Sequence, residues 1–303
     1  MTFDRRTFLR GLGAATASSL ALTSTVSAKG KNGPKKRGFP PSGITEWGGS
    51  QKIGNGEVST FATVTPSGNP KQVGVHFSEG ALDALPYAED FENGNVDNAM
   101  KSHGVWMKPF TLDLPDVVPE PFEYVGAGWN PQGHTPKGVY TKPHFDIHFY
   151  FNDRETIGDI GINPDTGKPY VISTDDIEKG QVPEGYVLLE GGAVVPNMGA
   201  HLAPADAPEL DSGKNPDGAS DWLHTLIWGA ADVDDDDAYE LNYVEPMITV
   251  DYLQNHLEGV QRQSIAQPDA YPQDGYYPTS YVTRNLGDDG WAVVVADFEK
   301  QEA

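Results

Sequence analysis

The sequence predicts a mainly β protein, an antiparallel sandwich or barrel with one or two short helices. One observation is a series of short runs in which apolar and polar residues alternate, separated by Gly, Pro, Asn and Asp. Such alternation is typical of strands that have one buried and one polar face. The other is the content of 34 glycines and 24 prolines in 303 residues, which favours many turns and few helices.

Seven segments have the alternation expected of strands. The first two are joined by the sequence PSGNP at 66–70, which predicts a hairpin. Two short segments, 79–85 and 248–257, fit a helical repeat better. The seven predicted strands are 56–65, 71–78, 104–114, 121–130, 144–151, 222–231 and 291–298.

The N-terminal residues 1–28 resemble a twin-arginine export signal. Arg5 and Arg6 precede a weakly apolar run at 12–26, and the small residues ending at Ala28 fit a cleavage site. The run is too short and too polar to span a membrane, which takes about 20 mostly apolar residues. We therefore expect a secreted protein without a transmembrane segment.

The remainder of the chain is expected to contain a disordered basic linker and one folded unit. Residues 29–43 are rich in Lys, Arg, Pro and Gly, which predicts disorder. Residues 44–303 are long enough for a single all-β domain, or for two sub-domains. The chain has no cysteine, so disulfides, thiolate ligands and Cys nucleophiles are excluded. We therefore expect any metal site to use His, Asp, Glu, Tyr or backbone oxygen.

The charge of the chain is strongly acidic. It has 44 Asp and Glu against 21 Lys and Arg, a formal net charge of −23. An excess of this size repels nucleic acid phosphates, so we expect no nucleic acid partner. It favours adaptation to high salt, where a Debye length of about 3 Å at 1 M screens the repulsion within the protein. The expected partners are a small-molecule ligand or a second copy of the chain.

The strand PHFDIHFYFN at 143–152 carries the chemistry. On a strand, His144, Asp146 and His148 share one face, while the residues between them are apolar and share the other. His144 and His148 are then about 13 Å apart, too far to bind one ion together unless the strand bends or bulges. Each lies about 7 Å from Asp146 at the backbone, so each can share an ion or a hydrogen bond with that carboxylate.

Further polar residues are candidates to complete a site. His134 lies in a Pro/Gly-rich loop before the strand, His201 follows a glycine turn, and Glu245 lies in the sequence VEPMIT. Imidazoles with carboxylates suit a divalent Zn, Fe, Mn or Cu ion. Asp146 and Glu245 are the candidate catalytic groups, either as a base or as residues that orient a histidine. The predicted metal ligands are His134, His144, His148 and His201.

Two other interpretations fit the same residues, and whether the protein is an enzyme stays open. The His-Asp-His face could be a buried hydrogen-bond network in a structural protein or a homo-oligomer. The six Trp and 13 Tyr also suit a carbohydrate- or small-ligand-binding module. The remaining histidines lack comparable neighbours and are expected to be structural; they are His76, His103, His224 and His256.

The chain resembles a family of exported bacterial and archaeal proteins of unknown activity. The resemblance covers about residues 56–298, and it brings no reaction with it. One departure is Gln132, where a histidine is expected in the turn N-P-x-G-H. The segments that carry the resemblance are P-H-F-D-x-H-F-Y, M-G-x-H and E-P-M-I-T.

A weaker similarity is to cupins. Gly138 stands six residues before His144, Glu155 follows His148, and PNMGAH is similar to the second cupin motif. The first cupin motif has two histidines two residues apart, whereas here the spacing is His-x-Asp-x-His. The similarity implies a β-barrel architecture and a first-row metal.

Overall fold

In the computed structural model the first strand begins at Ile44, after the predicted export signal and linker. The signal at 1–28, most of the predicted linker at 29–43, and His103 lie outside the described residues. Within the described part, no helix is long and apolar enough to cross a membrane. The described ranges are 39–40, 42–102, 104–211, 222–234 and 237–303.

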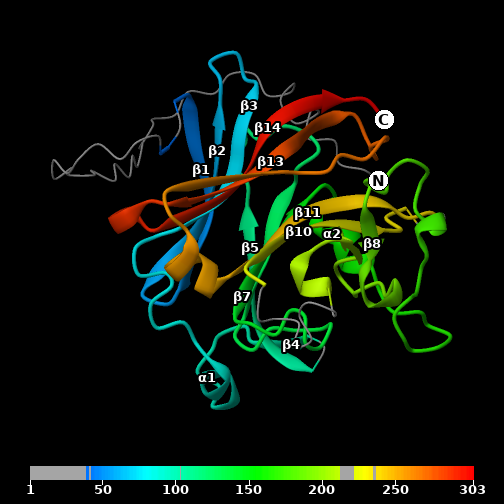
Figure 1. Cartoon of the computed structure of the whole chain (residues 1–303), viewed down its shortest axis with the longest axis horizontal. Coiled ribbons are helices and arrows are strands. Elements are labelled where there is room, and N and C mark those ends of the chain that lie inside the picture. The colour runs from blue at the N-terminus through cyan, green and yellow to red at the C-terminus, as the bar shows by residue number, and fades with distance from the viewer. Residues whose placement is uncertain (1–38, 41, 103, 212–221, 235–236) are drawn as a thin grey trace, which may run out of the picture. The chain divides into compact units, whose positions relative to one another are not determined.

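The first of two antiparallel sheets unites the two ends of the described chain. It has six strands in the order β1-β2-β3-β14-β13-β12. In Figure 1 its blue and cyan strands lie beside its orange and red strands, because β3 pairs with β14. Its strands are β1 (Ile44–Ile53), β2 (Gly56–Val64), β3 (Pro70–Phe77), β12 (Val260–Ser264), β13 (Gly275–Asn285) and β14 (Trp291–Gln301).

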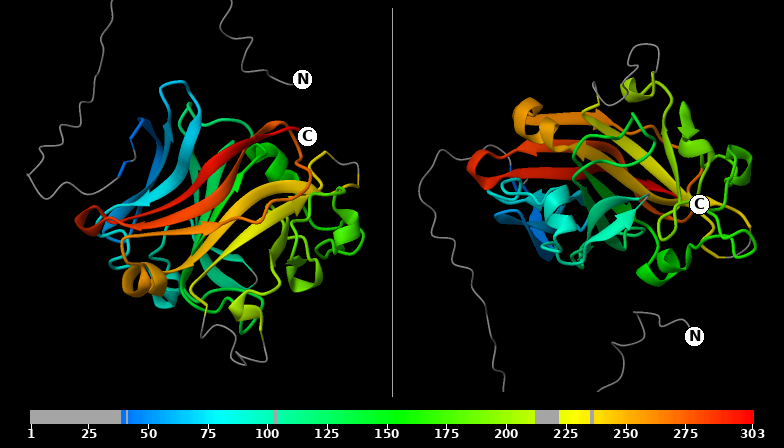
Figure 2. Two further views of the ribbon diagram at one scale, coloured as in Figure 1. Left: turned by 45° about the horizontal axis from the view of Figure 1, so that its top comes forward. Right: turned by 90° about the horizontal axis from the view of Figure 1, so that it is seen from below.

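The second sheet has eight antiparallel strands in the order β4-β5-β6-β7-β11-β10-β9-β8. Neither sheet closes on itself within the described ranges, so the sandwich alternative is confirmed and the barrel alternative is not (Figure 2). The strands are β4 (Met100–Ser102), β5 (Val105–Asp113), β6 (Tyr124–Asn130), β7 (His144–Tyr150), β8 (Tyr186–Leu188), β9 (Ala200–Pro204), β10 (His224–Ala231) and β11 (Glu240–Thr249).

The helices are short, as expected, and of the two predicted helical segments 248–257 is confirmed over residues 250–256, whereas 79–85 is not helical. Residues 79–85 form successive turns, because Gly80 and Ala84 adopt left-handed φ angles of 81° and 53°. Residues 248–257 begin as the end of β11 and turn helical only from Val250. The helical elements are α1 (Ala88–Glu92), α2 (Arg154–Asp159), the 3₁₀ turns η1 (Thr174–Asp176), η2 (Leu189–Gly191), η3 (Pro208–Leu210) and η5 (Gly287–Asp289), and the π-helical η4 (Tyr252–His256).

Strand β7 has different surroundings on its two faces, although all seven of its residues are buried. Its apolar face contributes to the core between the sheets, where the rings of Phe145 and Phe77 are 4.8 Å apart. The other face carries His144, Asp146 and His148. The chain between β7 and β10 covers this polar face and forms the green loops at the right of Figure 1. The sandwich therefore leaves the predicted site outside its central core, under a layer of loops.

A half-buried histidine between the two sheets gives the first testable prediction. Nδ1 of His224 lies 2.6 Å from the Tyr281 hydroxyl, and burial lowers its pKa to about 4. The unfolded chain, with a histidine pKa near 6.5, binds a proton between pH 6.5 and pH 4 that the folded chain does not bind. Stability therefore falls as the pH falls through this window, by up to about 3 kcal/mol.

The measurement is urea unfolding at several pH values in the wild type and in His224→Gln. The wild type should lose stability with acid more steeply than the variant. His148 has a pKa lowered to about 4 by burial as well, so the difference between the two proteins is the informative quantity. Equal slopes would contradict the assignment to His224.

Candidate metal centre

The structure gathers all six predicted site residues into two groups of three. Within each group, one nitrogen or oxygen ligand atom of each side chain lies within 4.8 Å of the others. His144 and His148 fall into different groups, as their separation along a strand requires. The first group is His134, His144 and Asp146, and the second group is His148, His201 and Glu245.

The first group is centred on the carboxylate of Asp146. Its Oδ1 lies 3.0 Å from Nε2 of His144, and its Oδ2 lies 3.3 Å from Nε2 of His134. Asn130, from the neighbouring strand β6, donates from Nδ2 to Oδ2 at 2.7 Å. The ring of His144 also packs 4.8 Å from that of Trp222. Strand β7, strand β6 and the loop after β6 thus hold this carboxylate between two imidazoles.

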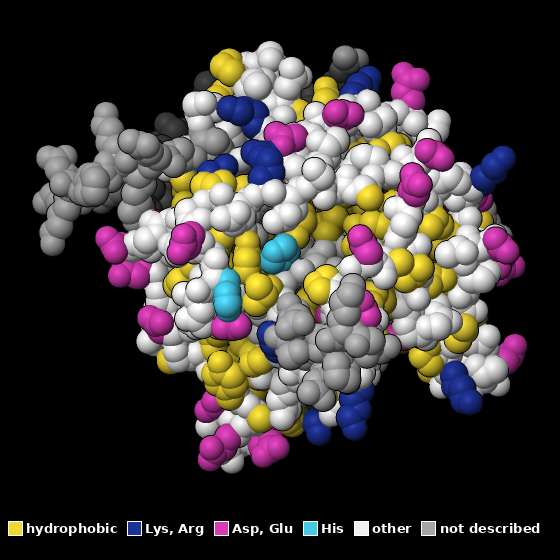
Figure 3. Space-filling model, in the orientation of Figure 1, with side chains coloured by type: hydrophobic (Ala, Val, Ile, Leu, Met, Phe, Trp, Pro, Cys, Tyr) yellow, Lys and Arg dark blue, Asp and Glu magenta, His cyan; other side chains and the backbone are white. Residues whose placement is uncertain are grey.

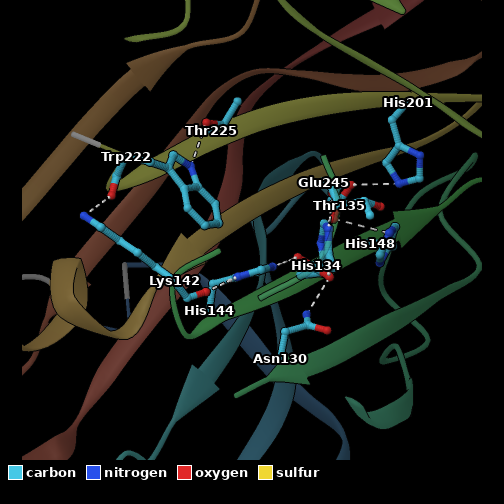
Figure 4. Close-up of polar contacts among 11 residues, drawn as sticks. Asn130, His134, Thr135, Lys142, His144, His148, His201, Trp222, Thr225 and Glu245 are labelled. Atoms are coloured by element: carbon cyan, nitrogen blue, oxygen red, sulfur yellow. Dashed lines mark hydrogen bonds and ion pairs between the residues drawn. The ribbon is translucent and has the colours of Figure 1, made fainter. Parts of the chain in front are cut away.

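The second group is centred on the carboxylate of Glu245. Its Oε1 lies 3.4 Å from Nε2 of His148, and its Oε2 lies 3.8 Å from Nε2 of His201. The register that pairs Val244 with Phe149 places Glu245 of β11 beside His148 of β7. In Figure 4, dashed lines join both of these histidines to Glu245.

A glycine on β10 allows the second group to form. Gly229 pairs with His201 on one side and with Tyr243 on the other. A Cβ at Gly229 would lie 2.1 Å from the Tyr243 ring, so this ring lies across the glycine. The ring centroid of Tyr243 is 4.8 Å from that of His148 and 5.8 Å from that of His201. Tyr243 is therefore a packing support for both imidazoles.

Backbone carbonyls fix the orientation of three of the four imidazoles. Nδ1 of His144 lies 2.7 Å from the Lys142 carbonyl, and Nδ1 of His134 lies 2.6 Å from the Thr135 carbonyl. The ring of His148 is bonded to the backbone of Gly126. A carbonyl only accepts, so the hydrogen of each neutral ring is on this side. The Nε2 lone pair of each ring therefore faces a carboxylate oxygen.

Several of these buried ligand atoms have no hydrogen-bond partner among the described residues. Although Nε2 of His144 and Oδ1 of Asp146 are 3.0 Å apart, their geometry is not that of a hydrogen bond. A buried polar atom without a partner costs about 1–3 kcal/mol, and two facing lone pairs repel unless a proton or a cation lies between them. The unpartnered atoms are Nε2 of His144, Oδ1 of Asp146, Nε2 of His148 and Oε2 of Glu245.

The two carboxyl groups differ in their electrostatics. Burial raises the pKa of Asp146, but the neighbouring His144 and His134 outweigh burial and hold this pKa well below its usual value. Burial, together with the charge of Asp146, raises the pKa of Glu245 well above its usual value. The surroundings thus favour a charged carboxylate in the first group and a protonated carboxyl in the second group. A cation in the second group would take the place of such a proton.

Two pockets give access to the groups. One has a volume of about 40 Å³, and His134, Asp146 and His201 are among its lining residues. The other has a volume of about 390 Å³, and Asp146 and His148 are among its lining residues. Asp146 lines both pockets, so each pocket borders at least one of the two groups.

Two glycines on β6 line the second pocket. Gly126 and Gly128 pair with His148 and Asp146, so a side chain at either glycine would project beside these residues. Sequence reasoning did not identify these glycines, nor Asn130 and Tyr243. The alternation in YVGAGWN places Gly126, Gly128 and Asn130 on one face and was the available signal. Nothing in the sequence marks the packing of Tyr243 over Gly229.

No known family model matches the chain, and no curated protein or solved structure matches it either. The resemblance to exported proteins of unknown activity stays a prediction.

Proposed function

We propose that this protein binds transition-metal ions, one ion in each His/carboxylate group. The observation that carries the proposal is the set of buried imidazole nitrogens and carboxylate oxygens that face one another without hydrogen-bond partners among the described residues. The carbonyls that hold the far side of three rings are the outer contacts that metal-binding histidines characteristically make. A cation in each group would satisfy the ligand atoms that the protein leaves unpartnered.

The buried hydrogen-bond network is the weaker interpretation. A polar network stabilises a fold when each of its members has a partner, and a partly satisfied network is worse than an apolar core. Here Asp146 accepts a hydrogen bond from Asn130 and faces His134 and His144 at 3.3 and 3.0 Å, while its Oδ1 lacks a partner in hydrogen-bond geometry. The two groups thus have the composition of ligand sets rather than of a completed network.

The arrangement suits metal-assisted chemistry. Three protein ligands leave at least one coordination position of a zinc-like ion open, which is the pattern of catalytic rather than structural sites. The pockets lead to these positions. A bound ion would supply Lewis acidity to water or to a small molecule there. The carboxylates of Asp146 and Glu245 then act as ligands in the resting site, and their assignment as bases stays a prediction.

We also propose that the protein is exported and adapted to high salt. The support is the twin-arginine motif with its apolar run and the net charge of −23. On the face shown in Figure 3, acidic side chains are spread around the periphery. Export by the twin-arginine route would deliver the protein already folded around its metal.

Elemental analysis of the protein, purified in high salt without chelator, tests metal binding. The expected result is near-stoichiometric zinc, iron, manganese or copper, one ion for each group. The variant His256→Ala is the matched control, because His256 pairs with Asp251 at a half-exposed position away from both groups. Folded wild-type protein that holds no metal, and whose melting temperature does not rise when these ions are added, would contradict the proposal.

A further inference from the structure

The four methionines of the described chain all line the pockets above the metal groups. The only other methionine is Met1. Elsewhere in the core, valine, leucine, isoleucine, alanine and aromatic side chains fill the space. The use of methionine is therefore confined to one place, where its thioether is near the proposed ligands. The four are Met100, Met107, Met198 and Met247.

Two of these methionines flank Asp146 within the sheet. Met247 of β11 pairs with Asp146, so the two side chains lie on the same face of adjacent strands. Gly128 of β6 pairs with Asp146 on the other side. The sulfur of Met107 fills the space over this glycine, because a Cβ at Gly128 would lie 2.8 Å from Sδ of Met107. Asp146 thus has a thioether side chain on each side.

The second group has different neighbours. Gly126 pairs with His148 in the same way that Gly128 pairs with Asp146. The space over Gly126 is filled by the ring of Tyr150, whose Cε2 would lie 2.8 Å from an added Cβ. The two equivalent gaps in β6 therefore receive a thioether beside the first group and an aromatic ring beside the second group. The first group thus has methionine side chains on both neighbouring strands of its carboxylate, whereas Met198 reaches the second group's surroundings only as a pocket-lining residue.

We propose that the first group is a copper site in which Met107 and Met247 supply thioether ligands to Cu(I). This inference rests on the proposed metal-binding function and adds the identity of the ion. Thioethers are soft ligands that favour Cu(I), carboxylates are hard ligands that favour divalent ions, and imidazole suits both. A group that offers all three can hold copper in either oxidation state. Zinc would use His134, His144 and Asp146 and would gain nothing from sulfur.

The ligand types expected of a chain without cysteine were His, Asp, Glu, Tyr and backbone oxygen. Under this proposal that set is too narrow, and the thioether sulfur of methionine has to be added to it. Met247 is 1 % exposed, and both methionines line the same pocket as His134 and Asp146. Met247 is therefore shielded from bulk solvent, whereas Met107 is half-buried at the pocket.

The test compares Cu(I) and Zn²⁺ affinities in the wild type and in the double variant Met107→Leu/Met247→Leu. Leucine keeps the apolar character and nearly the volume of methionine. Affinities are measured by competition with a chromophoric chelator, anaerobically and with reductant for Cu(I). We expect the double variant to lose about tenfold or more in Cu(I) affinity, equivalent to ~1.4 kcal/mol, with Zn²⁺ affinity unchanged. X-ray absorption should show sulfur bound to Cu(I) in the wild type and not in the variant.

Met100→Leu is the matched control. Met100 lines the wider pocket but lies on the edge strand β4 and is 44 % exposed, so its replacement should leave Cu(I) affinity unchanged. Unchanged Cu(I) affinity in the double variant, or a Cu(I) spectrum without sulfur, would overturn the inference and make the methionines an apolar pocket lining. Wild-type protein that binds neither Zn²⁺ nor Cu(I) would overturn the proposed metal-binding function itself.

Discussion

Asp146→Asn should empty the first group of its ion and leave the ion of the second group in place. The amide oxygen of asparagine can still accept the hydrogen bond that Asn130 donates to Oδ2, so the fold should survive. The change removes the negative charge that lies between His134 and His144. Loss of outer contacts to metal ligands costs about 10–100-fold in affinity, and loss of the carboxylate ligand itself should cost more.

Glu245→Gln is the complementary change. It should remove the ion held by His148 and His201 and leave the first group loaded. The measurement for both variants is metal content per chain after gel filtration in high salt, together with the Zn²⁺ dissociation constant. Comparison of the two variants assigns each ion to its group without a crystal structure.

A control of the same chemical kind separates ligand loss from a general effect of charge. Asp288→Asn changes an exposed carboxylate in η5, away from both groups, and should leave the metal content at the wild-type value. If Asp146→Asn and Glu245→Gln both retain the full complement of metal, the two carboxylates are not ligands. The proposed arrangement would then be wrong even if the protein binds metal elsewhere.

Alternation along β7 was sufficient to predict the face that carries the site. The strand at 144–151 is confirmed as β7, and its parity places His144, Asp146 and His148 on one face. The same argument predicted that His144 and His148 cannot share an ion. A strand that is buried on one face by the core and on the other by loops has to give its polar residues partners. Here Asn130 and the Lys142 carbonyl supply some of them, and the remaining ligand atoms are unpartnered.

The division into two groups could not be predicted from local sequence. It depends on the register between β7 and β11, which brings Glu245 to His148, and on the placement of β9 beside β10, which brings His201 to the same carboxylate. These pairings join segments that are far apart in the chain. Strand β11 was itself missed, because nine of its ten residues are buried and a strand covered on both faces loses the alternation that identifies strands.

The predicted helix at 79–85 shows a different limit. Its apolar spacing fits a helical period, yet the segment receives a hydrogen bond from the backbone of Asn55 to the carbonyl of Gly80 and forms turns. Tertiary contacts with the β1–β2 hairpin therefore override a weak local preference. Short apolar runs next to glycine carry too little local information to decide between helix and turn.

Gly229→Ala should destabilise the protein and weaken metal binding in the second group. The added Cβ would lie 2.1 Å from the Tyr243 ring in a buried central part of the sheet. Side chains inserted into a packed interior typically cost about 1–3 kcal/mol of stability. Because Tyr243 packs against both His148 and His201, displacement of its ring should also move the imidazoles apart from Glu245.

The measurement combines urea unfolding of metal-free protein with metal content of the loaded protein. Gly158→Ala is the matched control, since no atom lies within 4 Å of its added Cβ and the residue is exposed in helix α2. Alanine there should be neutral or stabilising by up to about 1 kcal/mol, from helix propensity. A Gly229→Ala protein as stable as the wild type, with both ions retained, would show that Tyr243 does not hold the second group in place. Loss of stability with selective loss of the second ion would link the packing of the sheet directly to the geometry of the metal centre.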